Sequence, residues 1–294
     1  MTETAHGYAI IEWVQSFHCA FLDYFFFGVT QLGNGAFYIV AIAFLYLCVD
    51  KRFAVKVFYL FIVGILANTI IKDCICAPRP DPEKVRIVMG YRSHGFSFPS
   101  GHSQGVLAFW GYCLTRFKSS GFVAAAVCLI VLIPVSRLYL GVHFPADVVG
   151  GLVIGAITIA VFVFFYRLIE RVRWEDKQAL ALCFLIGGPL LFFLLHPTAE
   201  VGQFIGTMIG FGTGAFLERR FIGFEERAAV PVQIAKMAVC AASLALVMYL
   251  CARIPVMPNV RNLVLYAIGG FWVGYGIPYC IVALKKKRAA PEAC

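Results

Sequence analysis

Long runs of apolar residues recur along the whole chain, and short polar connections separate them. A helix rises about 1.5 Å per residue, so about 20 residues are needed to cross a hydrocarbon core about 30 Å thick. About nine runs approach that length, with limits near 33–49, 53–72, 101–116, 120–137, 145–166, 178–195, 201–217, 229–251 and 263–284. Because lipid offers no partner to backbone polar groups, each run is expected to be helical. The pattern predicts an all-α, polytopic membrane helix bundle of about nine spans.

The residues ahead of the first run show a different pattern. Apolar side chains recur there at helical spacing, with polar side chains mostly opposite; the apolar set is Ile10, Trp13, Val14, Phe17, Phe21, Tyr24 and Phe25. Such a helix is typical of the membrane interface. We therefore expect residues 1–32 to form an amphipathic interfacial segment, with a tenth span as the alternative. The segment has neither a basic start nor a small-residue cleavage site, so it does not resemble a signal peptide.

Two glycine patterns interrupt the apolar runs. Gly33-Asn34-Gly35 is the clear turn signal near the start of the chain. Further on, a ladder with a period of four residues is formed by Gly202, Gly206, Gly210 and Gly214. A ladder of this kind lets a neighbouring helix approach closely. Packing inside the bundle is favoured over a seam between two copies of the chain.

Composition supports a membrane protein and excludes several other classes. Of the 294 residues, 61% are hydrophobic and 14% are charged, whereas soluble domains contain about 45–50% and about 25%. These values exclude a soluble enzyme and a disordered chain. The 11 cysteines are scattered, with no CxxC pair, so neither a metal nor a cofactor is expected. No arm rich in lysine, arginine and aromatic residues is present, so no nucleic-acid partner is expected.

The basic residues are divided unequally between alternate connections. One set of connections holds seventeen of the 25 Lys and Arg residues: Lys51, Arg52, Lys56, Arg116, Lys118, Arg167, Arg171, Arg173, Lys177, Arg219, Arg220, Arg227, Lys236, Lys285, Lys286, Lys287 and Arg288. The other set holds Lys72, Arg79, Lys84, Arg86, Arg92, Arg137, Arg253 and Arg261. By the positive-inside rule, the first face is expected to be cytoplasmic, with the C-terminus inside.

Polar residues that the topology does not require gather at three places. They are Lys72 to Arg79-Pro80, Pro99-Ser100-Gly101-His102, and Ser136-Arg137 through His143 to Asp147. All three are expected at span ends on the non-cytoplasmic face, where a helix bundle could bring them together. We interpret them as one site.

The charges in this site predict an anionic ligand. Lys72, Arg79 and Arg137 are cations, and the planar fork of Arg suits phosphate oxygens. Ser100 and Gly101 precede a predicted helix, where backbone amides and the helix dipole favour an anion. The structural alternatives are a simple helix cap for Ser100 and anchoring among lipid headgroups for an Arg at a span end.

The two histidines supply chemistry that a phosphate ester needs without a metal. One would attack to form a phospho-histidine, and the other would protonate the leaving alkoxide. His143 is the expected nucleophile because Asp147, four residues on, can hold the imidazole nitrogen that does not attack. Asn68 and Gln104 are expected near the site in supporting positions.

These three clusters resemble the signature of the type-2 phosphatidic acid phosphatase superfamily. The matching motifs are K-x6-RP (Lys72, Arg79, Pro80), PSGH (Pro99 to His102) and SR-x5-H-x3-D (Ser136, Arg137, His143, Asp147), and no position departs from them. The resemblance implies a catalytic membrane core over residues 33–170. It leaves residues 171–294 as about four additional helices and a basic tail, similar to the layout of glucose-6-phosphatase or of lipid phosphatases with extra spans.

The resemblance also implies a role for each motif residue. The phosphoryl group would be held by Lys72, Arg79, Ser100, Gly101 and Arg137. His102 would protonate the leaving group, and His143 would attack with Asp147 behind it. The implied reaction is metal-independent dephosphorylation, in which water finally hydrolyses the phospho-histidine with His102 as base.

A site at the interface of an apolar bundle suggests a lipid phosphate monoester or diphosphate as substrate. The expected partners are therefore the bilayer and a phosphorylated lipid; a homo-oligomer is not indicated. Three alternatives remain: a soluble sugar phosphate as substrate, phosphoryl transfer to another lipid, and transport, which is disfavoured because the charges lie at span ends. The expected location is a bacterial inner membrane with the site facing the periplasm or exterior, or else the endoplasmic reticulum with a luminal site.

Overall fold

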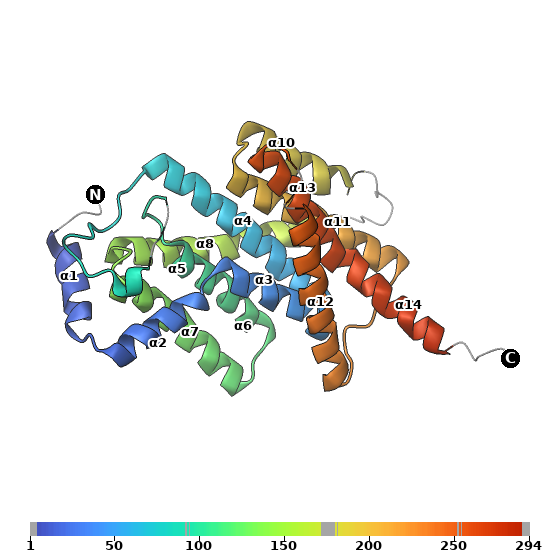
Figure 1. Ribbon diagram of the computed structural model, residues 1–294, viewed down its shortest axis with the longest axis horizontal. Helices are drawn as coiled ribbons and strands as arrows, with labels where there is room; N and C mark the ends of the chain where they lie inside the picture. Colours follow the sequence, from blue (N-terminus) through green and yellow to red (C-terminus); the bar gives the residue numbers. More distant parts are fainter. Residues whose placement is uncertain are drawn as a thin grey trace. The chain divides into compact units, whose positions relative to one another are not determined.

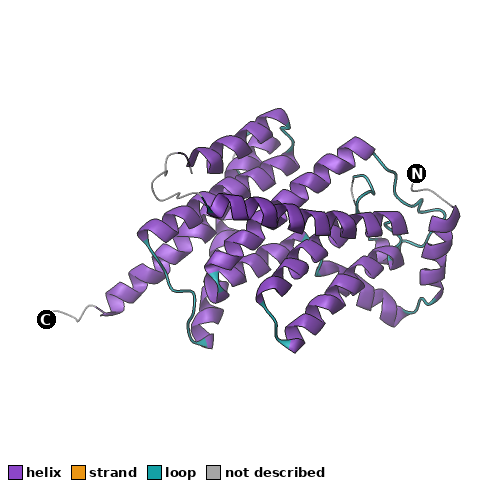
Figure 2. Cartoon of the chain, turned by 180° about the vertical axis from the view of Figure 1, so that it is seen from behind, coloured by secondary structure: helices purple, strands orange, loops and turns teal. Residues whose placement is uncertain are grey.

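The computed structural model describes residues 5–289 apart from residues 92, 94, 172–179, 181, 252 and 254. Throughout this part of the chain the regular structure is helical and no strand is present (Figure 2). Arg92, Arg173 and Lys177, which the charge pattern assigns to connections, lie outside the described residues. The chain forms two compact units: one runs up to Ala41 and from Val57 to Ile169, and the other comprises Ile42–Lys56 and the chain from Glu170 on.

The first unit contains all the residues of the three motifs. Its helices are α1 (Ala5–Ser16), α2 (Ala20–Gln31), most of α3 (Gly35–Phe44) and α4 (Lys51–Ile75), the short η2 (Val88–Gly90), then α5 (Gly101–Val106), η3 (Leu107–Gly111), α6 (Tyr112–Arg116), α7 (Ser120–Tyr139) and α8 (Pro145–Glu170). The segments α5, η3 and α6 form one continuous helix over 101–116. In this unit α5 lies among α4, α7 and α8 (Figure 1).

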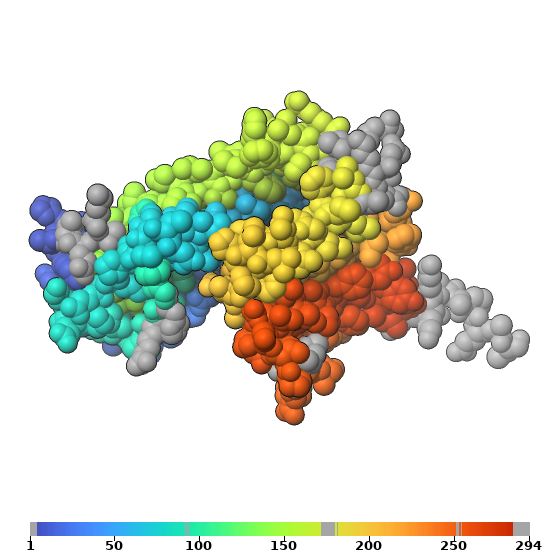
Figure 3. Space-filling model, turned by 90° about the horizontal axis from the view of Figure 1, so that it is seen from above, coloured from blue at the N-terminus to red at the C-terminus, as the bar shows by residue number. Residues whose placement is uncertain are grey.

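The second unit is built from the rest of the described chain. Its elements are η1 (Leu45–Val49), η5 (Cys183–Gly187), α10 (Gly188–Leu195), α11 (Ala199–Phe221), α12 (Val230–Cys251), α13 (Pro258–Phe271), η6 (Trp272–Gly276) and α14 (Ile277–Ala289). The glycine ladder of α11 packs against α13: a Cβ at Gly202 would lie 2.5 Å from the carbonyl oxygen of Asn259, and one at Gly210 would overlap that of Ala267. The gold atoms of α11 and the orange-red atoms of α13 adjoin in Figure 3. Packing within the chain, as expected for the ladder, is confirmed.

Within the described part of the chain, five helices are long and apolar enough to cross a membrane. They are Lys51–Ile75, Ser120–Tyr139, Pro145–Glu170, Val230–Leu250 and Pro258–Leu284. A sixth span arises if Ala20–Gln31 and Gly35–Val49, bent by 54°, count as one. The predicted count of nine is not confirmed: residues 101–116 are too few, Cys183–Leu195 is a shorter apolar helix, and α11 has the length but carries five glycines and charged ends. A helix over 101–116 is only about 24 Å long.

The N-terminal helices bury one polar side chain of α1 and leave several aromatic side chains outward. Gln15 is buried, and its amide donates to the carbonyl oxygens of Arg86 at 2.7 Å and Tyr139 at 2.9 Å. Trp13, two residues earlier, is 65% exposed, and Phe21 of α2 is 73% exposed. The Gln15 side chain therefore ties α1 to the loop that holds Arg86 and to the end of α7, and Trp13 is left outward.

Candidate active site

The three motifs meet in the first unit through direct hydrogen bonds. Arg79, in the loop after α4, lies 3.2 Å from His143 between Nη1 and Nε2. The backbone N–H of Ser100, just ahead of α5, donates to the carbonyl oxygen of Asp147 at 3.0 Å. Lys72, near the end of α4, donates to the carbonyl oxygens of Phe96 and Ser97 in the loop that leads to the PSGH motif. The sequence pattern predicts that the three motifs form one site, and these contacts link residues of the three motifs.

His143 lies at the corner between α7 and α8 and is backed by a buried polar pair. Asp147 occupies the first turn of α8, and its Oδ2 lies 3.4 Å from His143 Nδ1. Ser97 bridges the two, with its Oγ 2.5 Å from Asp147 Oδ2 and 3.2 Å from His143 Nδ1. The same Oδ2 accepts the backbone N–H of Phe144 at 2.8 Å. These bonds hold the Nδ1 edge of the His143 ring against Ser97 and Asp147. The opposite nitrogen, Nε2, therefore faces Arg79.

The electrostatics of this corner favour a neutral His143. Burial, followed by the positive charges of Arg137, Arg79 and Lys72, holds the pKa of His143 well below its usual value. Arg79 donates to Nε2 through Nη1, which fits a tautomer with the proton on Nδ1 and a lone pair on Nε2. Burial and the neighbouring Arg137 lower the pKa of Arg79 to about 10, so this group is still a cation at neutral pH.

The side chain of Arg137 is almost completely buried, with 1% of its surface exposed. Its Nη1 donates to Thr30 Oγ1 at 2.6 Å, and its Nη2 donates to Ser93 Oγ at 2.9 Å. The guanidinium lies 5.0 Å from the centre of the Tyr91 ring. Among the residues that the structure describes, no hydrogen-bond partner is found for Nε. A buried cation without a neighbouring carboxylate bond is costly, and this favours an anion as its functional partner.

Ser100 and Gly101 are arranged as a helix start. The hydroxyl of Ser100 accepts the N–H of Ser103 at 3.4 Å and the hydroxyl of Ser103 at 3.1 Å. The cap expected as the structural alternative for Ser100 is therefore present, and its own N–H is engaged with Asp147. Gly101 is exposed, and a Cβ there would lie 3.4 Å from Asn68 Oδ1.

His102 and its surroundings complete the cluster. His102 Nε2 lies 2.9 Å from Asn34 Oδ1, from the turn between α2 and α3. Asn68 donates to Gln104 Oε1 at 2.7 Å, and Gln104 donates to the carbonyl oxygen of Gly64 at 2.7 Å. These two amides link α4 to α5 beneath the PSGH loop, in the supporting position expected of them.

Sequence reasoning missed four residues whose side chains contact the motif side chains. They are Ser97, Thr30, Asn34 and Ser93. Asn34 had a signal, the Gly-Asn-Gly turn, but that pattern predicts a turn and no partner. The two serines and Thr30 had no signal, because neither a serine in a loop nor a threonine on an apolar helix belongs to a periodic pattern.

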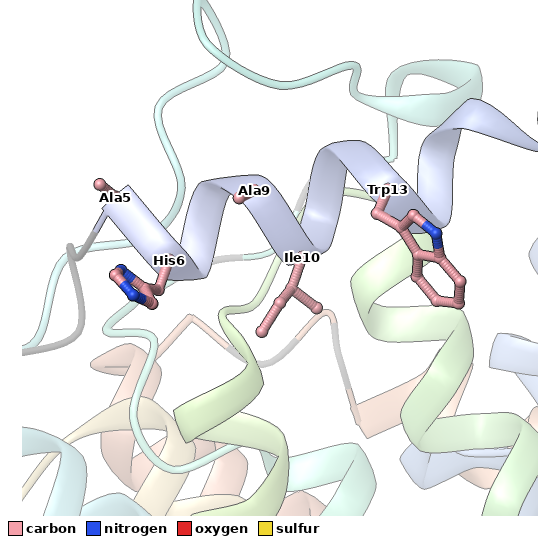
Figure 4. Close-up of a pocket in the computed structure, with 5 residues that line it drawn as sticks. All are labelled: Ala5, His6, Ala9, Ile10 and Trp13. Atoms are coloured by element: carbon pink, nitrogen blue, oxygen red, sulfur yellow. The ribbon is translucent and has the colours of Figure 1, made fainter.

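A separate hollow of about 460 Å³ lies along α1 and is lined by Ala5, His6, Ala9, Ile10 and Trp13 (Figure 4). Its walls are almost wholly apolar and come from one helix. None of the motif residues lines it, so we do not assign it to the chemistry.

The membrane-length helices mark an integral membrane protein, and three cations lie around its buried histidine. Comparison with known sequences identifies the family. The PAP2 superfamily matches residues 52–174, and the PAP2 superfamily phosphatase, transmembrane extension, matches residues 202–289. The chain belongs to the PAP2 superfamily.

Several individual proteins are similar to this chain. The "Probable sphingosine-1-phosphate phosphatase" of Dictyostelium discoideum is 28% identical over 214 residues, which cover 66% of this chain and 51% of that protein. The "Lipid A 4'-phosphatase" of Porphyromonas gingivalis is 29% identical over 163 residues, 48% of this chain and 69% of that protein. Among solved structures, the crystal structure of Aquifex aeolicus LpxE matches with a TM-score of 0.49 and 24% identity, over 55% of this chain and 98% of that one. The chain spans about half the length of several curated relatives that it matches.

Proposed function

We propose that the protein hydrolyses a lipid phosphate monoester or diphosphate without a metal, through a phospho-histidine intermediate. The observation that carries this proposal is the setting of His143. Its Nδ1 is backed by Ser97 and Asp147, and its Nε2 faces the guanidinium of Arg79 at 3.2 Å. An imidazole held in this way presents a nucleophilic lone pair beside a group that binds phosphate oxygens.

In the first step, His143 Nε2 attacks phosphorus and the bond to the leaving oxygen breaks. The electron pair of that bond goes to the leaving oxygen, which takes a proton from His102. Lys72, Arg79 and Arg137 stabilise the charge on the phosphoryl oxygens, with Ser100 and Gly101 at the helix start beside them. Asp147 and Ser97 stabilise the positive imidazole that forms.

In the second step, water attacks the phosphoryl group on His143. His102, now neutral, takes a proton from this water, and the P–N bond breaks so that the lone pair returns to Nε2. Inorganic phosphate leaves, and both histidines regain their starting protonation states. The cycle uses only groups of the chain and water.

Two observations support a lipid phosphate as the substrate class. The similar proteins carry names of phosphatases that act on sphingosine phosphate, lipid A or phosphatidylglycerophosphate. The outward aromatic side chains Trp13, Phe21 and Tyr24 suit the headgroup region of a bilayer. An amphiphile at that depth would keep its chains in lipid while its phosphate reaches the site.

The same proposal includes a membrane topology and a role for each segment of the chain. We place the site on the non-cytoplasmic face and the C-terminus in the cytoplasm, because of the uneven distribution of Lys and Arg. Residues 1–32 would be the interfacial segment, 33–170 the catalytic core, and 171–294 the additional helices with the basic tail. The membrane would be a bacterial inner membrane or, alternatively, that of the endoplasmic reticulum.

The test is phosphate release by the purified full chain in detergent, measured with and without EDTA. Phosphatidate, sphingosine-1-phosphate and glucose-6-phosphate are compared, and His143→Ala is measured beside His196→Ala, a histidine outside the cluster. Release from a lipid that is lost only in His143→Ala supports the proposal. Release from glucose-6-phosphate alone favours the soluble substrate, and loss of activity with EDTA contradicts the metal-free scheme.

Phosphoryl transfer remains the second candidate function, since only the acceptor differs from hydrolysis. An added lipid alcohol that becomes phosphorylated without matching phosphate release would establish it.

A further inference from the structure

The acid proposed for the reaction, His102, is held by a residue outside the part of the chain that matches the PAP2 superfamily. Its Nε2 lies 2.9 Å from Oδ1 of Asn34. Asn34 belongs to the turn between α2 and α3, whereas the superfamily match covers residues 52–174. The contact joins positions 68 residues apart in the sequence. It is therefore a specific tertiary contact and not a consequence of the PSGH motif.

A second hydrogen bond fixes the orientation of the Asn34 amide. Its Nδ2 donates to Gln31 Oε1 at 2.5 Å. An amide that donates through Nδ2 to Gln31 presents its carbonyl oxygen to His102. Because that oxygen can only accept, the proton of the contact belongs to His102 Nε2.

The backbone of the same turn holds the ring from its edge. A Cβ added at Gly33 would lie 2.6 Å from Cδ2 of His102 and 2.8 Å from Cγ2 of Ile133. In an imidazole, Cδ2 and Nε2 are neighbours on one edge, and Nδ1 lies on the opposite edge. The Gly33-Asn34 turn therefore covers the Cδ2–Nε2 edge and leaves Nδ1 as the nitrogen that it does not hold.

We propose that Asn34 is a positioning residue for His102, and that the proton given to the leaving oxygen comes from Nδ1. This inference rests on the proposed function. Burial and the neighbouring cations hold the pKa of His102 well below its usual value while the site is empty of an anion. The bound phosphate anion offsets those cations, so that before the first step His102 carries protons on both nitrogens. As the bond from phosphorus to the leaving oxygen breaks, the Nδ1 proton passes to that oxygen, and the Nε2 proton stays on the bond to Asn34. In the second step, Nδ1 takes a proton from the attacking water.

The chemical identity of the holding group distinguishes the two histidines. His143 is backed by a carboxylate, which stabilises the positive imidazole formed when it attacks. His102 is backed by a neutral amide, which orients the ring without stabilising its charged form to the same extent. A less stabilised imidazolium is the better proton donor. The two backing groups thus suit a nucleophile and an acid.

The test compares two phosphate esters of similar size whose leaving groups differ in their need for an acid. The anion of 4-nitrophenol leaves without a proton, whereas the alkoxide from 2-phenylethyl phosphate requires one. The value of kcat/KM reports the steps up to leaving-group departure. We expect Asn34→Ala to lower kcat/KM for the alkyl ester about 100-fold, and to lower it far less for the nitrophenyl ester. Asn34→Asp keeps an acceptor oxygen for Nε2 but stabilises the imidazolium as a carboxylate, so it should restore only part of the alkyl activity.

A matched pair of glycines provides a second, independent test of the positioning role. Gly33→Ala pushes a methyl group against His102, whereas a Cβ at Gly35 meets nothing within 4 Å. Gly33→Ala should therefore change the ratio between the two esters in the same direction as Asn34→Ala, and Gly35→Ala should leave it unchanged. The Gly33→Ala variant tests the positioning role even if Asn34→Ala fails to fold. Loss of folded protein lowers both activities equally, so a changed ratio between the two esters reports on His102 and not on folding.

The outcomes separate this inference from the proposed function. If the wild type releases no phosphate from the lipid substrates of the proposed function, or if His143→Ala is as active on them as the wild type, the proposed function fails. If the wild type is active and depends on His143, but the Asn34 and Gly33 variants, shown to be folded by their elution and melting temperature in detergent, lower the activity on both esters equally or not at all, the positioning role is overturned.

Discussion

Asp147 and His143 meet at a separation too long for a good direct hydrogen bond. Oδ2 of Asp147 lies 3.4 Å from Nδ1 of His143, whereas N–H···O bonds usually measure about 2.7–3.2 Å. The hydroxyl of Ser97 occupies the bridging position, at 2.5 Å from the carboxylate and 3.2 Å from the imidazole. The carboxylate therefore acts on the histidine partly through space and partly through this hydroxyl.

Replacing Ser97 with Ala should slow turnover and leave substrate binding nearly unchanged. Without the hydroxyl, Nδ1 loses its shorter bond and the imidazole is held less firmly, so we expect kcat to fall about 10- to 100-fold. Asp147→Asn should cost at least about 100-fold, because the negative charge is lost as well. Phosphate release over a range of substrate concentrations gives kcat and KM separately. Ser119→Ala, at an exposed helix start, is the control, and a normal kcat in Ser97→Ala would show that the direct contact is sufficient.

The charge state of His143 should respond to an anion in the site. Burial and the charges of Arg137, Arg79 and Lys72 keep the pKa of His143 well below the ordinary 6.5. A lowered pKa means that the neutral, nucleophilic form persists as the pH falls through 6.5, where an exposed histidine gains a proton. Bound vanadate would offset the three cations and raise the midpoint. Nitrogen NMR of histidine-labelled protein, with His143→Ala to identify the signal, measures both states. A midpoint at or above the ordinary value without vanadate would contradict the electrostatic argument.

Thr30 should matter for anion binding although it lies on an N-terminal helix. Its hydroxyl accepts a hydrogen bond of 2.6 Å from the buried Arg137. Thr30→Val keeps the shape and removes the acceptor, so we expect a loss of about 1–3 kcal/mol in stability and several-fold weaker inhibition by vanadate. Thr158→Val is the matched control, since its hydroxyl bonds only a carbonyl of its own helix, that of Ile154. Equal effects of the two substitutions on vanadate inhibition would remove Thr30 from the site.

The sequence pattern identifies the charged and nucleophilic residues of this site but does not identify the residues that orient them. Lys72, Arg79 and His143 stand out because charged or titratable side chains are expensive in an apolar chain. Ser97 and Asn34 are short polar residues whose importance depends on which segment folds against them. The spacing of residues along the sequence does not show which segments fold together.

The same limit applies to the fold. The apolar runs predict helices, and helices are found over the described parts of those runs. Periodicity separates the two faces of α1 but does not say which face meets protein. The structure buries Ile11 and Gln15 and exposes Trp13. Ile11 packs in a core cluster with Phe144, and the Gln15 amide donates to backbone carbonyl groups.

The glycine ladder leads to a prediction about assembly as well as stability. Gly206 and Gly210 of α11 lie so close to α13 that an added Cβ would overlap the carbonyl oxygens of Leu263 and Ala267. Gly210→Ala should force these helices apart and lower stability by about 1–3 kcal/mol, seen as a lower melting temperature in detergent. Gly188→Ala, where a Cβ meets nothing within 4 Å, is the control. Because α13 of the same chain already covers the ladder, the molecular mass of the protein in detergent should be the same for both variants and the wild type. A substitution that left the melting temperature unchanged but altered the mass would assign the ladder to a contact between copies of the chain.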